Sequence, residues 1–210
     1  RHTRYEFVTG VQTCALPIYK KIAIERGGMK PEDVFVLRSG PKLERLKIQE
    51  PKPEIKRGKK FMVGYLGVIG QQEGIEYLLK AAKYIKELPG RNDVFWGIVG
   101  GGPDVEHMKK LSHEMELDDI VEFTGRVPDQ TLLDYLNTAD VCVNSDEYNA
   151  MNDKSTMNKV LEYMALGKPL VQFDLTEGRY SAQEASLYAK RNDAEDMAKK
   201  ILELLDNPEK

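Results

Sequence analysis

The sequence predicts an α/β protein, a three-layer αβα sandwich around a parallel sheet of the Rossmann-like kind. From Lys59 onward, short runs rich in β-branched and aromatic residues alternate with amphipathic helical segments. Ile75, Leu78, Leu79 and Ala82 illustrate the helical spacing, because they recur at i, i+3, i+4 and i+7. Strands that alternate with helices are typical of a parallel sheet covered on both faces.

Six strands and four helices are predicted in this domain. The strands are expected at 60–67, 94–100, 120–125, 141–144, 169–174 and, more weakly, 186–189. The helices are expected around 75–85, 132–136, 157–165 and 194–205. Before this domain, 20–28 resembles the end of a helix followed by glycine, and 33–41 a strand that runs into a turn.

The chain divides into three parts by composition. Val8 to Ile18 matches the translation of a DNA string that resembles a sequencing-library adapter, so residues 1–18 are expected to be a disordered artefact. Residues 19–57 are interpreted as a remnant of another domain plus a charged, proline-bearing linker that is exposed. Residues 58–210 form the sandwich domain. An adapter joined to coding sequence also predicts that the chain is a fragment.

Composition excludes several classes of protein. The 31 basic and 34 acidic residues leave a net charge of −3, without the basic excess of a nucleic-acid-binding domain. Outside 1–18 the one cysteine, Cys142, is expected to be a buried small hydrophobe. No apolar run approaches the ~20 residues of a membrane span, so we expect a soluble cytoplasmic protein. His107 and His113 are expected on the surface, and no metal site is predicted.

Two glycine-rich loops follow the first two predicted strands. Gly67 and Gly70 belong to the first, and Gly101 and Gly102 to the second. A dinucleotide fingerprint would need glycine at 105, where the chain has valine, so a dehydrogenase is disfavoured. Glycines at these positions suit either a ligand that approaches the backbone or a tight turn without a ligand.

The third loop leads into a helix with a predicted anion site. Met157, Val160, Leu161, Met164 and Ala165 are expected to form its packing face. Asn152 or Asp153 can cap its start, which would leave the amides near Ser155, Thr156 and Met157 free to bind an anion. Ser155, Lys159 and Glu162 are expected to face outward. Glu162 would then reach ribose hydroxyls, or Lys159 and Glu162 would form only a solvated pair.

The order of these segments resembles the donor-binding half of a GT-B glycosyltransferase, of the retaining family 4 type. The resemblance covers about 58–205, and "LEYMALGKP" (161–169) is its most specific part. It implies a nucleoside-diphosphate-sugar donor and no cofactor. The base would lie by Arg126 and Val127, the ribose by Glu162, and the diphosphate by the amides of Thr156 and Met157. The acceptor, a glycan, lipid or small molecule, would bind a missing N-terminal domain, and the parent enzyme could associate with a membrane surface in polysaccharide biosynthesis.

Three positions depart from the family pattern. Val68 and Glu73 stand where members commonly carry an arginine and a lysine for the diphosphate, and Lys154, beside Asp153, replaces a glutamate. Lys154 could supply the missing phosphate charge, or the donor chemistry could differ. Two other functions stay open, a nucleotide-sugar epimerase of the same fold and a non-catalytic nucleotide-binding scaffold. Glu177 and Arg179, in the loop after 174, are further candidates for contact with the donor sugar.

Overall fold

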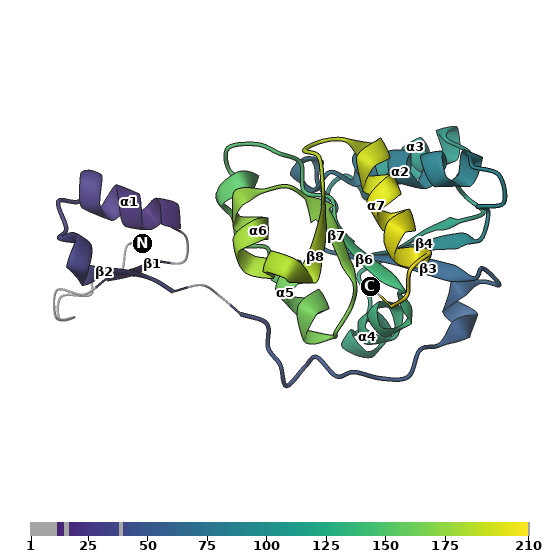
Figure 1. Ribbon diagram of the computed structural model, residues 1–210, viewed down its shortest axis with the longest axis horizontal. Coiled ribbons are helices and arrows are strands. Elements are labelled where there is room, and N and C mark those ends of the chain that lie inside the picture. The colour runs from purple at the N-terminus through teal and green to yellow at the C-terminus, as the bar shows by residue number, and fades with distance from the viewer. Residues whose placement is uncertain (1–11, 15–16, 38–39, 210) are drawn as a thin grey trace.

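The computed structural model describes residues 12–14, 17–37 and 40–209 (Figure 1). These residues form a small N-terminal unit and a larger sandwich domain, joined by an extended segment. The N-terminal unit consists of β1 (Gln12–Cys14), α1 (Pro17–Glu25) and β2 (Val34–Val36). Figure 1 shows this unit standing apart from the sandwich.

The sandwich domain is built on a six-stranded sheet in which every strand pair is parallel. The strand order is β5-β4-β3-β6-β7-β8. The strands are β3 (Phe61–Leu66), β4 (Val94–Val99), β5 (Val121–Gly125), β6 (Val141–Asn144), β7 (Leu170–Phe173) and β8 (Ser186–Ala189). All six predicted strands are present, and the parallel αβα fold is confirmed.

Helices cover both faces of this sheet (Figure 1). One face carries α2 (Ile75–Glu87), α3 (Val105–Glu114) and α7 (Ala194–Leu205), and the other α4 (Asp129–Thr138), α5 (Asn158–Ala165) and α6 (Thr176–Ala182). Successive strand residues feed the two cores, since Met62 packs under α4 and α5 while Val63 packs under α2 and α7. Cys142 is fully buried in the core under α4 and α5, as expected.

The N-terminal unit differs from the disorder expected for residues 1–18. Gln12–Cys14 pairs in parallel with Val34–Val36, and α1 begins at Pro17. A strand as short as β2 presents unpaired backbone groups at its edges, and β1 satisfies one of these edges. Residues 1–11 and 15–16 lie outside the described residues.

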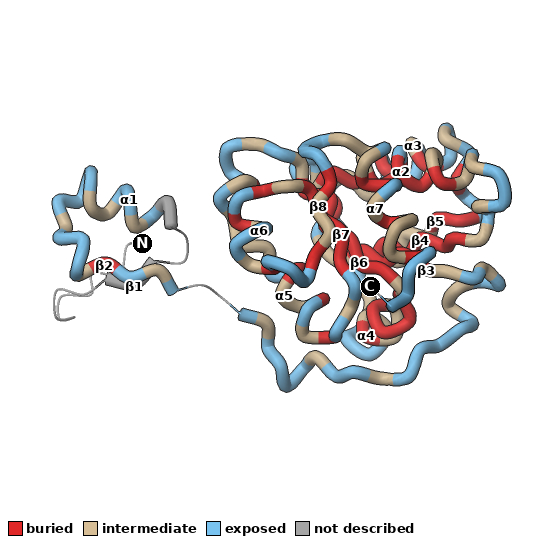
Figure 2. Tube along the Cα trace, viewed as in Figure 1, coloured by how far each residue is buried: buried red, intermediate tan, exposed pale blue. Residues whose placement is uncertain are grey.

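The segment before β3 is exposed along much of its length but is attached to α4 (Figure 2). The amide of Gln49 donates to Asn137 Oδ1 at 3.0 Å, and the amide of Lys52 donates to Thr138 Oγ1 at 2.9 Å. Leu46 packs against the core under α4 and α5. The expected linker is therefore an extended segment attached to the sandwich domain, because its backbone bonds to polar side chains at the end of α4. We call residues 40–57 the strap.

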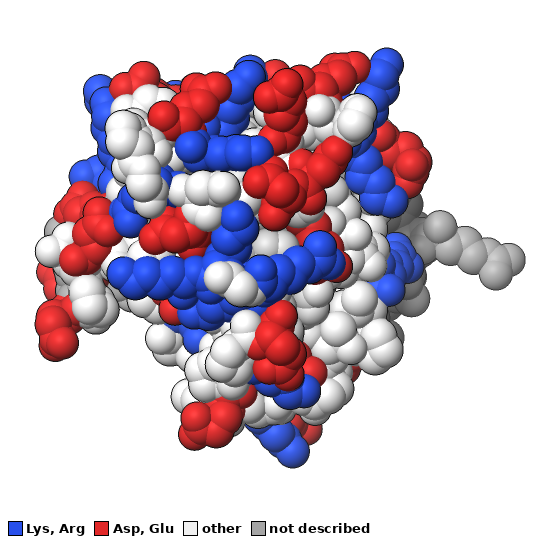
Figure 3. Space-filling view, turned by 90° about the vertical axis from the view of Figure 1, so that its right-hand side faces the viewer, with Lys and Arg blue, Asp and Glu red and all other residues white. Residues whose placement is uncertain are grey.

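The strand order reverses between β3 and β6. Loops from these two strands run to opposite faces of the sheet, which opens a crevice at their carboxyl ends where ligands bind in open α/β sheets. Elsewhere the surface carries intermingled charge, and Figure 3 shows basic and acidic side chains interspersed over one such face. Within the described ranges, no helix is both long and apolar enough to cross a bilayer.

Candidate functional site

The two glycine-rich loops pack directly on each other at the carboxyl edge of the sheet. The amide of Gly67 donates to Val99 O at 3.0 Å, and the amide of Ile69 donates to Gly101 O at 3.2 Å. A Cβ on Gly100, whose φ is 137°, would lie 1.8 Å from Gly67 O. Contact between two backbones therefore explains the glycine at 100 without a ligand.

The three other predicted glycines differ from one another in what a side chain at their position would contact. A Cβ on Gly102 would lie 2.2 Å from Ile69 O, so this glycine also serves the contact between the loops. A Cβ on Gly70 would meet only Glu73, at 3.9 Å, and one on Gly101 would meet Arg126 Cγ at 3.2 Å. The exposed side chain of Arg126 thus lies against Gly101, which brings together two residues predicted for the donor site.

Helix α5 begins later than predicted, at Asn158. Asp153 is not its cap but caps α6, because Asp153 Oδ1 accepts hydrogen bonds from Thr176 N at 3.0 Å and Thr176 Oγ1 at 3.1 Å. Asn152 Nδ2 instead donates to the backbone oxygens of Gln72 and Glu147, both at 2.9 Å. Asn152 and Asp153 therefore hold the segment before α5 to neighbouring loops and to α6.

The free amides at this helix start lie slightly further along the chain than expected. The Ser155 amide is occupied, since it donates to Asn152 O at 3.1 Å. In the described part of the chain, no acceptor takes the amides of Thr156, Met157, Asn158 and Lys159. Unpaired amides at the positive end of the helix dipole suit an anion.

The packing face of α5 is rotated from the prediction. Val160 and Tyr163 are buried, whereas Met164 is 36% exposed. The Tyr163 hydroxyl accepts a hydrogen bond from Leu66 N at 2.7 Å, and this bond holds the helix against the end of β3. Apolar spacing placed Val160 correctly but not Met164. The face is rotated because two polar side chains, Tyr163 and Lys159, find partners inside the domain.

Lys159 is 9% exposed and lies in a buried cluster that also contains Asp146, Glu73 and Tyr65. Its ammonium contacts Asp146 Oδ1 at 2.9 Å, Glu73 Oε2 at 3.1 Å and the Tyr65 hydroxyl at 3.2 Å. The expectation that Lys159 faces solvent is therefore wrong, and the solvated pair with Glu162 does not form. We call these four residues the Lys159 cluster.

The cluster shifts the pKa of each of its acids. Burial raises the pKa of Asp146 to about 6, even though Lys159 favours its ionised form. Burial would also raise the pKa of Glu73, but the charge of Lys159 and hydrogen bonds outweigh it and hold that pKa below its ordinary value. Burial raises the pKa of Tyr65 to about 12. Asp146 Oδ2 is buried and has no hydrogen-bond partner in the described residues.

Glu162 lies half-buried one residue before Tyr163. Among the described residues, none hydrogen-bonds or ion-pairs with its carboxylate, although Arg45 of the strap lies close enough to favour its charge. Burial raises its pKa above the ordinary value. A half-buried carboxylate without a partner is costly unless a ligand uses it.

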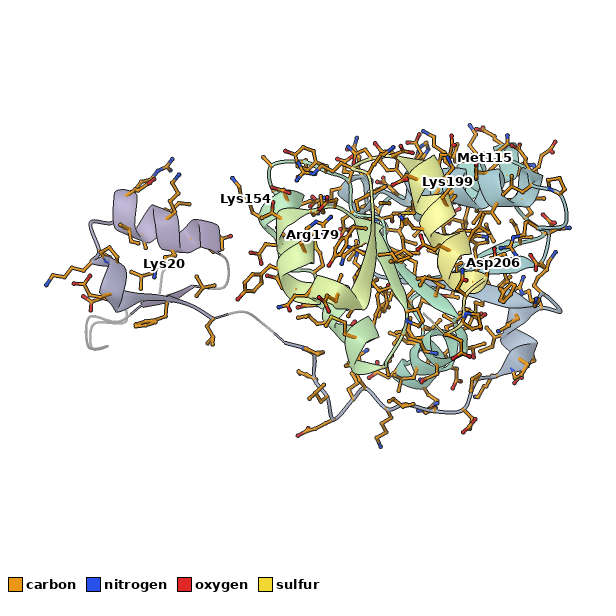
Figure 4. The ribbon with its side chains drawn as sticks, viewed as in Figure 1. Lys20, Met115, Lys154, Arg179, Lys199 and Asp206 are labelled. Carbon is orange, nitrogen blue, oxygen red and sulfur yellow. The ribbon has the colours of Figure 1, made fainter. Side chains whose placement is uncertain are left out.

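The remaining predicted residues lie just before α5, in the loop after β5 and on α6. Lys154 is exposed and extends away from the domain (Figure 4). Ser155 Oγ donates to Met151 O at 2.8 Å, and Val127 is half-buried in the loop after β5. Thr156 Oγ1 donates to the buried carboxylate of Glu177 at 3.0 Å. Glu177 therefore supports Thr156 rather than facing the crevice.

Two further predictions concern groups outside the crevice. Arg179 points outward, where it pairs with Asp174 and stacks on Tyr188 (Figure 4). His107 and His113 are exposed on α3 as expected. Over 12–14, 17–37 and 40–209, no group of three or more potential ligands could hold a metal ion.

Sequence reasoning missed Asp146 and Tyr65 as members of the site. One signal was available for Asp146, since an acid that follows a buried strand at this edge of the sheet faces the crevice. Glu73 was recognised only as a departure from a pattern. Its meaning depends on Lys159, which approaches from another element 86 residues away.

Comparison with known proteins places this geometry in a family. The model for "Glycosyl transferases group 1" matches residues 60–207. An uncharacterized glycosyltransferase of Haemophilus influenzae is 27% identical over 163 residues, which cover 76% of this chain and 43% of the relative. The chain thus spans less than half the length of that relative.

Solved structures share the fold at low identity. Anabaena HepE in complex with UDP and glucose superposes with a TM-score of 0.77 at 15% identity, over 96% of this chain and 55% of HepE. Staphylococcus aureus TarM, solved with fondaparinux, α-GlcNAc-glycerol and UDP, gives a TM-score of 0.71 at 19% identity, over 94% of this chain and 37% of TarM. The fold is that of GT-B glycosyltransferases, and the family match shows that the chain belongs to the group 1 glycosyltransferases.

Proposed function

We propose that the chain holds the donor in a retaining transfer of sugar from a nucleoside diphosphate sugar to an acceptor. The acceptor, a glycan, lipid or small molecule, would bind another domain of a longer enzyme, so the chain alone would bind donor without turnover. The observation that carries the proposal is the unpartnered Glu162 carboxylate. It lies on α5, the helix with four free amides at and just before its start, at the crevice where the strand order reverses.

Each part of the donor has a chemically suitable group. Carboxylates accept hydrogen bonds from hydroxyls, so Glu162 is assigned to the ribose. The free amides from Thr156 to Lys159 are assigned to the diphosphate. Arg126 and Val127, by the exposed edge of Gly101, are assigned to the base. Lys154 is assigned to the phosphates, since it is exposed and no described acid pairs with it.

The nucleotide is proposed to be UDP. HepE and TarM, which share the fold, were solved with UDP. A GT-B epimerase is disfavoured because the described histidines, His107 and His113, lie on the exposed side of α3. A non-catalytic scaffold stays the second candidate, because Val68 and Glu73 replace the cations that the family carries.

The test is calorimetric titration of UDP into the chain and into Glu162→Gln. A hydrogen bond to a charged group contributes about 1.5–3 kcal/mol, so the variant should bind UDP roughly 10–100-fold more weakly. 2′-Deoxy-UDP should bind both proteins with nearly equal affinity. Glu184→Gln, at an exposed glutamate before β8, is the control and should bind like the parent. If the chain binds no nucleoside diphosphate, the donor-binding proposal is wrong; if Glu162→Gln binds UDP unchanged, the ribose assignment is wrong.

A further inference from the structure

We propose that Glu73, Lys159 and Asp146 position the first glycine-rich loop, residues 67–74, for the donor diphosphate, and that a proton on Asp146 strengthens this hold. These are positioning residues, because they act through the loop and the start of α5. The identity of the ligand rests on the proposed function, whereas the hold on the loop rests on contacts within the chain.

Three elements meet at the Lys159 ammonium. Lys159 comes from α5, Glu73 from the short 3-10 helix Gln71–Glu73 that ends the loop, and Asp146 from the segment after β6. The lysine side chain also passes under the loop, because a Cβ on Gly67 would lie 3.2 Å from Lys159 Cε. One buried cation therefore supports the loop at its beginning and anchors it at its end.

Backbone contacts bring the end of the loop to the same place. Ser145 Oγ donates to Glu73 O at 2.9 Å. Gly74 has a φ of 64°, and a Cβ there would lie 1.9 Å from Ser145 O. The Glu73 backbone is thus held to the segment that carries Asp146, which places the Glu73 carboxylate beside Lys159.

The charges of the cluster do not balance when both acids are ionised. Two carboxylates and one ammonium give a net charge of −1, and protonation of Asp146 makes the cluster neutral. The other described groups that face Asp146 are the hydroxyls of Tyr65 on β3 and Tyr163 on α5, and burial keeps the pKa of both above the ordinary value. The buried, unpartnered Oδ2 is the atom available for this proton.

A bound diphosphate would favour the neutral cluster for two reasons. It adds negative charge beside the backbone of Lys159, which raises the cost of a second ionised acid nearby. A protonated Asp146 also no longer competes with Glu73 for the Lys159 ammonium, and it no longer repels the Glu73 carboxylate. Binding is then linked to uptake of one proton, and affinity should fall as pH rises past the pKa of Asp146, which is about 6.

The experiment titrates UDP into the parent chain and into Asp146→Asn between about pH 5.5 and 8. This range extends from below to well above the pKa of Asp146. Asparagine keeps the size of the side chain and mimics the protonated acid. The affinities should be nearly equal at the low end, whereas at the high end Asp146→Asn should bind roughly three- to tenfold more tightly, since one pKa unit corresponds to a factor of ten. Comparison at each pH cancels ionisation of the UDP phosphate. Identical pH profiles, or weaker binding by Asp146→Asn throughout, would overturn the proposal.

A second measurement needs no ligand. Hydrogen exchange of residues 68–74 at neutral pH should be slower than the parent in Asp146→Asn and faster in Glu73→Gln, which weakens the anchor. Glu76→Gln is the matched control, because among the described residues Glu76 pairs with exposed Lys80 on α2. Unchanged exchange in both test variants would reject the positioning role even if UDP binds. Altered exchange without UDP binding would support that role and reject the proposed function.

Discussion

At the scale of single residues, the Asp146 carboxyl makes stability depend on pH. Burial raises its native pKa to about 6, above the ordinary value of 3.8. The native state therefore binds this proton more readily than the unfolded chain, and the contribution of Asp146 to stability falls as pH rises from about 4 through 6. In urea unfolding, Asp146→Asn should gain stability relative to the parent over this window, by at most about 3 kcal/mol. A constant difference across the window would contradict this.

Lys159 should be far more important for stability than Lys154. Lys159→Met leaves Glu73 and Asp146 buried without their cation, and loss of one partner from a buried ion pair costs about 3–5 kcal/mol. Lys154→Met, in the exposed 3-10 turn before α5, should change the free energy of unfolding by less than about 0.5 kcal/mol. Thermal or urea unfolding of the two variants measures the difference. Equal losses would show that the Lys159 cluster does not stabilise the fold.

The environment of Cys142 could be predicted from the sequence and that of Lys159 could not, for a physical reason. Cys142 was predicted correctly because an apolar strand has one plausible environment. Lys159 was assigned to solvent because an unpaired lysine is costly to bury. Its two carboxylates come from segments 86 and 13 residues away, and only the fold brings them to it.

At the scale of elements, α5 shows how far periodicity can be trusted. The spacing of apolar residues located the helix, but one polar bond, from Leu66 N to the Tyr163 hydroxyl, helps set its rotation. Tyr163→Phe would leave the Leu66 amide without this acceptor at the end of β3, at a cost of about 1–3 kcal/mol. Tyr148→Phe, on an exposed loop, is the control and should be nearly neutral. An equal, small effect of both changes would show that packing alone orients α5.

At the scale of the whole molecule, the sheet was predictable and the strap was not. Each strand run has a helix beside it in sequence, so alternation alone predicts a parallel sheet. The segment 40–57 has no such period, and its charge and prolines resemble a free linker. Its contacts with α4 depend on Asn137 and Thr138, two buried polar residues that accept hydrogen bonds from the backbone of this segment.

This difference predicts how truncations behave. A chain that starts at residue 40 lacks only the N-terminal unit, which stands apart from the sandwich (Figure 1), so the melting temperature of the sandwich should be unchanged. A chain that starts at residue 58 also loses the strap. Asn137 Oδ1 and Thr138 Oγ1 then lose their backbone donors, Lys56 no longer pairs with Asp140 at 2.7 Å, and Ile55 leaves the core.

The second truncation should therefore be clearly less stable than the first. Burial of one large aliphatic side chain contributes about 1.5–3 kcal/mol and each hydrogen bond about 0.5–1.5 kcal/mol, so a loss of several kcal/mol is expected. Differential scanning calorimetry of the parent and both truncations measures it. Asn137→Ala in the parent removes the acceptor for the Gln49 amide and the side-chain donor to Lys47 O and Leu133 O, so it should reproduce a fraction of the loss. If the chain from 58 melts with the parent, the strap is a free linker after all; if the chain from 40 melts much lower, the N-terminal unit is part of the sandwich fold.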